Sequence, residues 1–399
     1  MIGGGSGIEY GPKAGAPASI ARTIRATRTI TQRFICFGRI VLRAGETGGG
    51  WLCSSLYTHA SMSGKVKAAV AGANGYAGMT LVSLLARHPG VQLAQLTSRS
   101  FAGKPYSEVF PLLDLKGEFR SEPDANGLDV VFSCLPHNVG ASKAAGWLNA
   151  GARVIDMSAD FRLQDAKQYP VYYRQEHPEP DLLAKAVFGL PELHERELKD
   201  AKLIAVPGCY STASILALAP AVAAGLAASD FVVDAKSGVS GAGRSPGMGV
   251  HFSEVNESVG AYAIGGHRHL PELTQELGKL SRNGDVHVTF VPHLIPMTRG
   301  ILATCYFDLK GSLDELQDAY REFYAGQPFT KVVAQTPTTK LASHTNLCLV
   351  NVAAQGRKAV VTAALDNLIK GASGQGVECF NIAFGFDRTT ALEFPPQWP

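Results

Sequence analysis

The feature that most constrains the fold is a short apolar run that ends in glycine and leads into a helical pattern. Residues 67–72 (KAAVAG) are apolar after the first position, as expected of a buried strand in a parallel sheet. Residues 76–88 then space their apolar side chains as a helix does, and the pattern stops at Pro89. Strand-like segments follow at 91–97, 128–135 and 153–157, with a helical segment at 139–149. This alternation predicts a doubly wound parallel sheet.

The pattern changes after about residue 230. Apolar and other residues alternate at 285–291 and 301–309, which is typical of antiparallel strands. Further strand-like segments lie at 347–353 and 359–364, and helical ones at 313–324 and 366–384. A chain of 399 residues is too long for one hydrophobic core. We therefore expect an α/β fold with two domains: residues 63–210 with the doubly wound sheet, and residues 211–365 with an antiparallel sheet that has helices on one face.

Charge is distributed unevenly along the chain. Residues 1–62 hold seven of the 37 Lys and Arg residues but only two of the 34 acidic residues, so the remainder is near neutral. A segment rich in Arg, Ser and Thr and poor in acids is typical of an organelle transit peptide, with a disordered tail as the alternative. The near-neutral remainder gives no reason to expect nucleic-acid binding. No stretch of the sequence resembles a transmembrane helix.

The segment after the first predicted strand has the pattern G-x-x-G-x-x-G, formed by Gly72, Ala73, Asn74, Gly75, Tyr76, Ala77 and Gly78. Between a strand and a helix, such glycines let the backbone approach a pyrophosphate, which the helix N-terminus attracts. We expect a dinucleotide there, although a tight structural turn is the plainer alternative. The second strand ends in Ser98 and Arg99, without the acid that usually holds the ribose of NAD. This favours NADP, unless Arg99 is only a solvated surface residue.

The chain has seven cysteines, an odd number, and no Cys-x-x-Cys pair. We therefore expect no disulfide framework, no metal site and a reducing compartment. One cysteine, Cys209, follows a strand-like run at 203–206 and precedes an apolar, helical run at 211–224. A cysteine at a helix N-terminus has a lowered pKa, so we predict that Cys209 is a nucleophile. The alternative is an inert core cysteine.

A nucleophilic thiol needs a partner that accepts its proton. His267 and His269 lie two residues apart and so project in different directions, which allows only one of them to face Cys209. We predict His269, with His267 as the alternative. If Pro271 opens a helical turn, Glu272 lies three residues on and is placed to orient His269. Separately, a Gly- and Ser-rich segment at 237–244 is expected either to bind an anion, through Ser240, Gly241 and Arg244, or to be a flexible loop.

Together these motifs resemble the N-acetyl-γ-glutamyl-phosphate reductase family of arginine biosynthesis, over roughly residues 65–392. The residues that carry the resemblance lie at 72–78, 98–99, 135–137, 158–162, 207–210, 237–244, 267–272, 292–300 and 367–375. One departure is Ser211, where many members of the family have proline. This departure leaves Cys209 in place.

The resemblance implies a homo-oligomer, dimer or tetramer, with a Rossmann-type first domain at residues 63–210. Its second domain, at residues 211–365, would be an α+β catalytic and oligomerisation domain like that of glyceraldehyde-3-phosphate and aspartate-semialdehyde dehydrogenases. In that fold the C-terminal helix, here within residues 366–399, returns to the first domain and would place Asn367 and Gln375 beside the nicotinamide. The resemblance also implies that Pro136 contacts the cofactor and that Arg162 and His267 contact the substrate. A plant-type member would be imported into the plastid stroma, whereas composition alone leaves the mitochondrion open.

The implied activity is NADPH-dependent reduction of N-acetyl-γ-glutamyl phosphate to N-acetylglutamate 5-semialdehyde, through a thioester on Cys209 and with release of phosphate. His269 would manage the protons, and Arg244, Arg162 or loop amides, which the sequence does not rank, would hold the phosphate. Two alternatives stay open. One is aspartate-semialdehyde dehydrogenase, and the other is a non-catalytic redox regulator that binds NADP and needs neither Cys209 nor His269.

Overall fold

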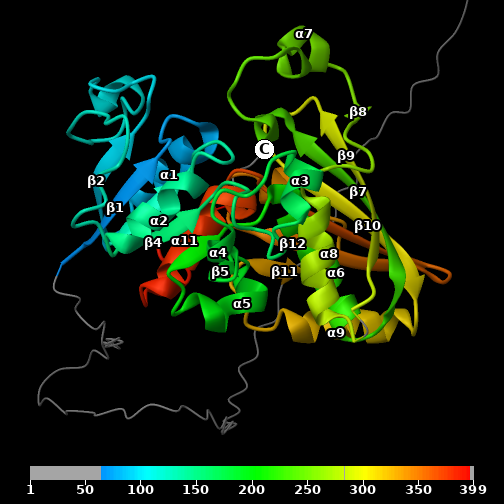
Figure 1. Cartoon of the computed structure of the whole chain (residues 1–399). Helices are drawn as coiled ribbons and strands as arrows, with labels where there is room; N and C mark the ends of the chain where they lie inside the picture. The colour runs from blue at the N-terminus through cyan, green and yellow to red at the C-terminus, as the bar shows by residue number, and fades with distance from the viewer. Residues whose placement is uncertain (1–63, 283, 396–399) are drawn as a thin grey trace, which may run out of the picture. The chain divides into compact units, whose positions relative to one another are not determined.

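The computed structural model describes residues 64–282 and 284–395 (Figure 1). The predicted transit peptide at residues 1–62 lies outside the described residues, so that assignment and the plastid location stay predictions. Two β-sheets with their helices form the described part of the chain. None of its helices is both long and apolar enough to cross a membrane.

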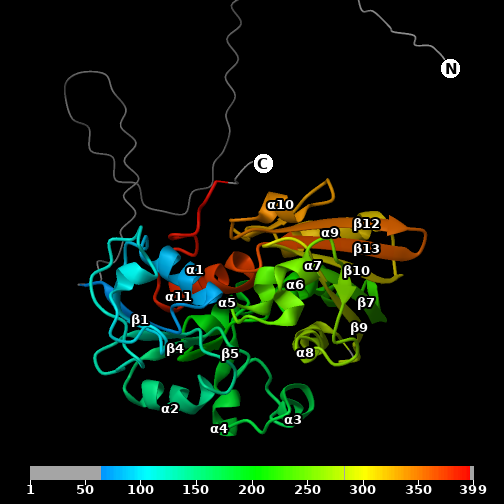
Figure 2. The same ribbon diagram turned by 90° about the horizontal axis from the view of Figure 1, so that it is seen from above.

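The first sheet is parallel throughout, with the strand order β2-β1-β3-β4-β6-β5. Its strands are β1 (Val66–Ala71), β2 (Val91–Thr97), β3 (Val130–Ser133), β4 (Arg153–Asp156), β5 (Ala186–Phe188) and β6 (Leu203–Ala205). Five of the six residues of β1 are buried, because helices cover both faces of the sheet. Seen from above, α1 and α11 lie on one face and α2 on the other (Figure 2). The predicted doubly wound sheet is therefore confirmed.

The helices near this sheet include the last helix of the chain. They are α1 (Tyr76–Leu85), α2 (Ala141–Asn149), α3 (Gln168–Tyr173), α4 (Pro180–Leu183), α5 (Pro191–Leu198) and α11 (Gly374–Ala383), with a short turn η1 (Tyr106–Glu108). Leu81 and Leu85 of α1 share one hydrophobic core with Phe380 of α11. Trp147 of α2 belongs to the core on the opposite face. The end of the chain thus packs against the first sheet, beside the helix that follows the glycine-rich loop.

The second sheet has seven strands in the order β11-β12-β13-β10-β7-β9-β8. Its strands are β7 (Ala227–Gly238), β8 (Gly260–Ala261), β9 (His287–Ile295), β10 (Ile301–Leu309), β11 (Thr330–Val332), β12 (Cys348–Gln355) and β13 (Lys358–Leu365). An antiparallel sheet was expected, but β7 pairs with β9 and β11 with β12 in parallel, so the sheet is mixed. The alternation of apolar residues along a strand does not show which strand it pairs with, or in which direction, so these two parallel pairings could not be read from the sequence.

Helices cover one face of the second sheet, as expected. They are α6 (Cys209–Ala223), α8 (Leu270–Leu280) and α9 (Leu313–Phe323); the remaining short elements are α7 (Phe252–Val255), α10 (Thr339–Ala342), η2 (Val239–Ala242), η3 (Met248–Val250) and the π-helix η4 (Ile369–Ser373). Helix α6 continues through Pro220, which has no amide hydrogen to give to the carbonyl of Leu216. The hydroxyl of Tyr324 donates to that carbonyl instead, at 2.5 Å. The tertiary contact thereby satisfies the group that proline leaves open.

A buried ion cluster joins the π-helix η4 to α5 and α11. The Nζ atom of Lys370 lies 2.7 Å from Glu192 and 2.9 Å from Glu378, and all three side chains are fully buried. Thr330 also donates to Glu192, at 2.6 Å, and Arg388 pairs with Glu378 at 2.7 Å. Charges removed from water are tolerated only when such partners surround them. This cluster fixes η4 beside the cavity described below.

We expect the Lys370→Met variant to lower the free energy of unfolding by roughly 3–5 kcal/mol, because removal of one partner leaves buried carboxylates unpaired. Urea denaturation at a fixed protein concentration measures the change. The matched control is Lys358→Met, whose partner Asp308 is also largely exposed, and we expect it to cost less than about 1 kcal/mol. Equal stabilities of the two variants would contradict the role of the buried cluster.

Candidate active site

A cavity of about 1020 Å³ opens at the carboxyl ends of strands in the first sheet and extends to the start of α6. Loops after β1, β2, β3 and β6 line it, together with residues 240–246 and with Asn367, Leu368, Gly371 and Ala372. Ligands of open parallel sheets bind in this position. The cavity brings together ten of the eleven predicted cofactor residues: Gly72, Asn74, Gly75, Tyr76, Ala77, Gly78, Ser98, Arg99, Pro136 and Asn367.

The glycine-rich loop between β1 and α1 is tight enough to require two of its glycines. Gly72 has φ +79°, and a β-carbon on it would lie 2.6 Å from the carbonyl oxygen of Cys134. A β-carbon on Gly78 would lie 2.8 Å from the α-carbon of Ala73. Gly75 precedes α1, and no side chain caps that helix, which leaves its first amides available to an anion. These features fit a dinucleotide pyrophosphate.

Two cations and one carboxylate lie beyond the end of β2. The Arg99 side chain is 72% exposed and lies 3.9 Å from Glu122, while Lys143 of α2 lies 2.8 Å from the same carboxylate. All three residues line the cavity, as does the buried Ser98. This end of the cavity therefore has a net positive charge. Sequence reasoning missed Lys143, since no motif links it to β2.

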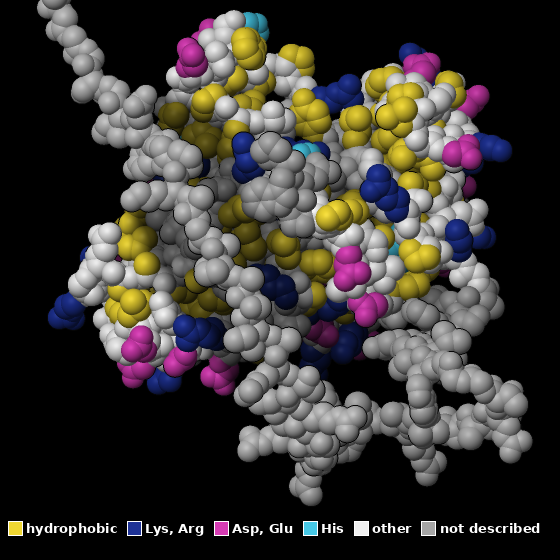
Figure 3. Space-filling model, turned by 180° about the vertical axis from the view of Figure 1, so that it is seen from behind, with side chains coloured by type: hydrophobic (Ala, Val, Ile, Leu, Met, Phe, Trp, Pro, Cys, Tyr) yellow, Lys and Arg dark blue, Asp and Glu magenta, His cyan; other side chains and the backbone are white. Residues whose placement is uncertain are grey.

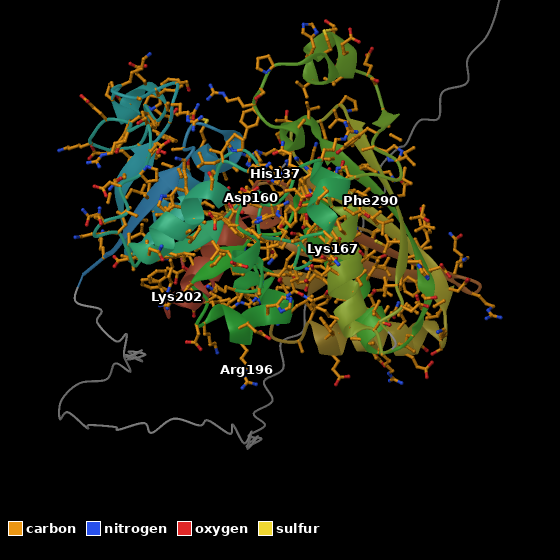
Figure 4. The ribbon with its side chains drawn as sticks, in the orientation of Figure 1. His137, Asp160, Lys167, Arg196, Lys202 and Phe290 are labelled. Carbon is orange, nitrogen blue, oxygen red and sulfur yellow. The ribbon has the colours of Figure 1, made fainter. Side chains whose placement is uncertain are left out.

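A buried carboxylate fixes the loop after β3 that presents Pro136 to the cavity. His137 and Asp160 contact each other, as Figure 4 shows, and Asp160 also accepts from the amides of Asn138 at 2.7 Å and Ala141 at 2.9 Å. Burial would raise the pKa of Asp160, but these hydrogen bonds hold it below its ordinary value. A charged carboxylate thus stabilises both the loop and the start of α2.

Only one of the two predicted C-terminal residues lines the cavity. Asn367 accepts from the amide of Gly300 at 2.8 Å and donates to Ser240 at 3.0 Å, so it braces the loop opposite the cofactor residues. Gln375 is fully buried, and its amide donates to Thr212 of α6 at 3.1 Å. The assignment of Gln375 to the cofactor is therefore wrong. Its helix, α11, turns this side chain toward α6 rather than the cavity.

Cys209 lines the cavity as the first residue of α6, as predicted. Its predicted lowered pKa is wrong: burial raises the pKa of the thiol to about 11. Arg162, the backbone amide of Tyr210 and Arg268 oppose this effect without overcoming it. The thiol is therefore protonated at neutral pH.

His269 rather than His267 lies beside the nucleophile. A β-carbon on Gly208 would collide with the imidazole of His269, so the ring packs directly on the residue before Cys209. Burial lowers the pKa of His269 well below its ordinary value, and nearby cations lower it further, which makes the ring neutral. His267 accepts the amide hydrogen of His269 at 3.1 Å and faces a second cavity. The geometry therefore favours His269 as the base.

Glu272 does not orient His269 by a hydrogen bond, contrary to expectation. Its carboxylate accepts instead from the amide of Gly208 at 2.9 Å and from Arg162 at 3.3 Å. Nδ1 of His269 is buried and has no hydrogen-bond partner among the described residues. Glu272 lies in the first turn of α8, which faces the backbone before Cys209. Its carboxylate thus fixes the position of Gly208. The carboxylate is a positioning group.

The predicted anion loop, with Ser240, Gly241 and Arg244, lines the cavity. Arg244 donates to the carbonyl of Asn74 at 2.8 Å and so connects this loop to the glycine-rich loop. Arg162 lines the same cavity but also donates to the carbonyls of Val206 at 2.7 Å and Met157 at 3.1 Å. Neither cation is free of protein partners.

Sequence reasoning missed the contact between η4 and the nucleophile. A β-carbon on Gly371 would lie 2.8 Å from the β-carbon of Cys209. Two residues on, Ser373 donates to the carbonyl of Ala77 at 2.8 Å, in the first turn of α1. π-Helical turns occur frequently at functional sites. Within the described residues, no cluster of His, Cys, Asp and Glu has the arrangement of a metal site.

Comparisons with known proteins agree with this geometry. Residues 67–201 match the family model "Semialdehyde dehydrogenase, NAD binding domain", and residues 209–367 match "Semialdehyde dehydrogenase, dimerisation domain". Among solved structures, aspartate semialdehyde dehydrogenase II from Vibrio cholerae, complexed with ASA, superposes with a TM-score of 0.64 and 16% identity. That match covers 80% of this chain and 98% of the other. An aspartate semialdehyde dehydrogenase with NADP from Candida albicans gives a TM-score of 0.60 at 17% identity, covering 80% and 98%. These likenesses show the fold.

Sequence relatives are considerably more similar. The N-acetyl-gamma-glutamyl-phosphate reductase of Dehalococcoides mccartyi (strain CBDB1) is 45% identical over 333 residues, covering 82% of this chain and 98% of the relative. Those of Symbiobacterium thermophilum and Ectopseudomonas mendocina are each 46% identical. They cover 82% and 84% of this chain and 97% and 100% of their own lengths. The chain belongs to the N-acetyl-gamma-glutamyl-phosphate reductase family.

Proposed function

We propose that the chain reduces N-acetyl-γ-glutamyl phosphate to N-acetylglutamate 5-semialdehyde with NADPH and releases phosphate, as a step of arginine biosynthesis. The observation that carries the proposal is the position of Cys209. It lies at the start of α6, in the same cavity as the glycine-rich loop and directly after the residue on which His269 packs. Relatives of this name, 45–46% identical over most of the chain, favour this substrate over aspartyl phosphate.

The first stage joins the substrate acyl group to Cys209. The Sγ atom attacks the carbonyl carbon of the acyl phosphate, the bond to the phosphate oxygen breaks, and a thioester forms. The thiol proton must leave at this point, because its pKa is about 11. His269, neutral and adjacent, accepts that proton. Arg162 stabilises the developing thiolate, since its charge lowers the pKa of Cys209.

The second stage returns the proton. A bound reduced nicotinamide supplies the hydride that converts a thioester to an aldehyde. The carbon–sulfur bond then breaks, and the thiolate needs a proton. Protonated His269 is a strong donor, because burial and its cationic neighbours lower its pKa. The hydrogen bond from the Gly208 amide to Glu272 keeps Cys209 beside the His269 ring in both stages.

We propose NADP rather than NAD as the cofactor, and a homo-oligomer, dimer or tetramer, as the active form. The positive charge of Arg99 and Lys143 beyond β2, against Glu122 alone, supports binding of a 2′-phosphate. For the oligomer, a dimerisation-domain model matches the region of the second sheet. Helices cover one face of that sheet, whereas Val232 of β7 and Tyr306 of β10 are exposed.

The direct test is phosphate-dependent reduction of NADP⁺ with N-acetylglutamate 5-semialdehyde, with aspartate semialdehyde as the paired substrate. We expect the acetylated substrate to be preferred, and Cys209→Ala to lower turnover by at least about a thousandfold, because no thioester can form. NADPH binding, followed by fluorescence titration, should be retained in that variant. Unchanged turnover in that variant would refute the thioester. NADPH binding without turnover by the wild type would instead favour the redox-regulator alternative.

Ionisation of Cys209 gives a separate prediction. Because the thiol has a pKa of about 11, its thiolate fraction should rise about tenfold per pH unit between pH 7 and 9. The rate of alkylation by iodoacetamide, measured by mass spectrometry of the Cys209 peptide, should rise in parallel. A rate that is already at a plateau near pH 7 would show a preformed thiolate instead.

The cofactor proposal is tested at Arg99. We expect Arg99→Ala to raise the KM for NADPH by roughly tenfold or more, since a charged hydrogen bond to phosphate contributes about 1.5–3 kcal/mol. The KM for NADH should barely change. The matched control is Arg196→Ala, because Arg196 is an exposed guanidinium that points into solvent from α5 (Figure 4). Equal effects on both cofactors would contradict a 2′-phosphate contact.

A further inference from the structure

A second cavity of about 1000 Å³ adjoins the first. The two share four lining residues, which are Gly241, Ala242, Ser245 and Arg268. Much of its wall belongs to an arm, residues 247–266, that carries α7 and rejoins the second sheet through β8, which pairs with β9. The α7 end of this arm stands away from the sheet (Figure 1). Seen from behind, this arm forms the top of the molecule and exposes hydrophobic side chains (Figure 3). The second cavity therefore reaches the nucleophile's surroundings from the side of the arm.

Arg268 is the cation at the junction of the two cavities. Its guanidinium is exposed and makes no hydrogen bond or ion pair with any described residue, whereas Arg162, Arg244, Arg99 and Lys143 all have protein partners. Its charge nevertheless reaches the catalytic groups, since it lowers the pKa values of Cys209 and His269. An unpaired guanidinium beside the reacting thiol suits an anionic ligand.

The remaining walls of the second cavity combine aromatic and aliphatic residues with a few polar ones. Tyr172, Tyr262, Val255, Leu294 and Ile295 form an apolar part, while Ser258, His267 and the carboxylate of Glu254 also line the cavity. Such a surface suits a small N-acyl group, and not the departing phosphate, which is entirely polar. In the substrate of the proposed reaction, the acylated amino group and the α-carboxylate are attached to the same carbon. A cation at the edge of this cavity therefore lies where that carboxylate would be.

We propose that Arg268 binds the α-carboxylate of the substrate, and that the second cavity holds its N-acyl end. This assignment rests on the proposed function. It makes Arg268 a specificity-determining residue, because an aldehyde without the carboxylate would leave the guanidinium unpaired at the mouth of the cavity.

The reverse reaction tests this assignment, because there the two anions of the acyl phosphate are separate substrates. For Arg268→Gln we expect the KM for N-acetylglutamate 5-semialdehyde to rise about ten- to a hundredfold, as for loss of a charged hydrogen bond. The KM values for phosphate and NADP⁺ should stay nearly unchanged. Arg268→Lys should restore part of the affinity, and Arg196→Gln, remote from both cavities, should behave as the wild type. A rise in the KM for phosphate instead would assign Arg268 to the phosphoryl group and overturn the proposal.

A second substrate separates carboxylate binding from an indirect effect on Cys209 or His269. 4-Acetamidobutanal is the same aldehyde without the α-carboxylate. For the wild type, we expect kcat/KM to be lower with 4-acetamidobutanal than with N-acetylglutamate 5-semialdehyde. This decrease should be about as large as the one that Arg268→Gln causes with N-acetylglutamate 5-semialdehyde. With 4-acetamidobutanal, Arg268→Gln should have the same kcat/KM as the wild type. An equal loss by the variant on both aldehydes would overturn the carboxylate contact. Wild-type turnover is measured first, since its absence would refute the proposed function, whereas turnover with an unchanged aldehyde KM in Arg268→Gln refutes this proposal alone.

Discussion

The carboxylate of Glu272 holds the candidate site together. It is fully buried at the start of α8 and accepts from both the Gly208 amide and Arg162, while Arg162 also donates to backbone carbonyls after β4 and β6. A buried carboxylate is stable only with such partners, so the turn before Cys209, the arginine and the first turn of α8 are fixed relative to one another. His269 directly precedes that helix. The Arg162–Glu272 ion pair thereby helps to fix the position of His269 relative to Cys209.

Close backbone approach does the rest of the positioning around the thiol. The ring of His269 packs on Gly208, and Gly371 of η4 packs on the β-carbon of Cys209, so both contacts require glycine. The buried Lys370 holds η4 between two carboxylates, and Ser373 joins η4 to the start of α1. The π-helix therefore connects the nucleophile with the glycine-rich loop through short, rigid contacts. The position of Cys209 relative to the glycine-rich loop is thereby fixed.

Local patterns in the sequence were sufficient for the parts of this site that depend on local structure. The strand, loop and helix around residues 72–78 and the place of Cys209 at a helix start follow from spacing and composition. The partners of Glu272 and Gln375 do not, because tertiary packing decides which group a helical side chain meets. The parallel pairing of β7 with β9 is likewise a long-range choice. The thiol's pKa was mispredicted for a related reason: helix position is visible in sequence, whereas burial of the sulfur is not.

The thiol of Cys209 and the imidazole of His269 are both neutral before substrate binds, so a nearby cation acts on the ionisation of each. A positive charge near both groups favours the thiolate but disfavours the imidazolium, so its two effects on proton transfer from Cys209 to His269 oppose each other. Arg268 lowers the pKa values of both Cys209 and His269. The equilibrium of proton transfer between these two residues therefore depends on Arg268 less than either pKa does. The Arg268 side chain makes no hydrogen bond or ion pair with a described residue, so its charge is available to the substrate carboxylate that we propose it binds.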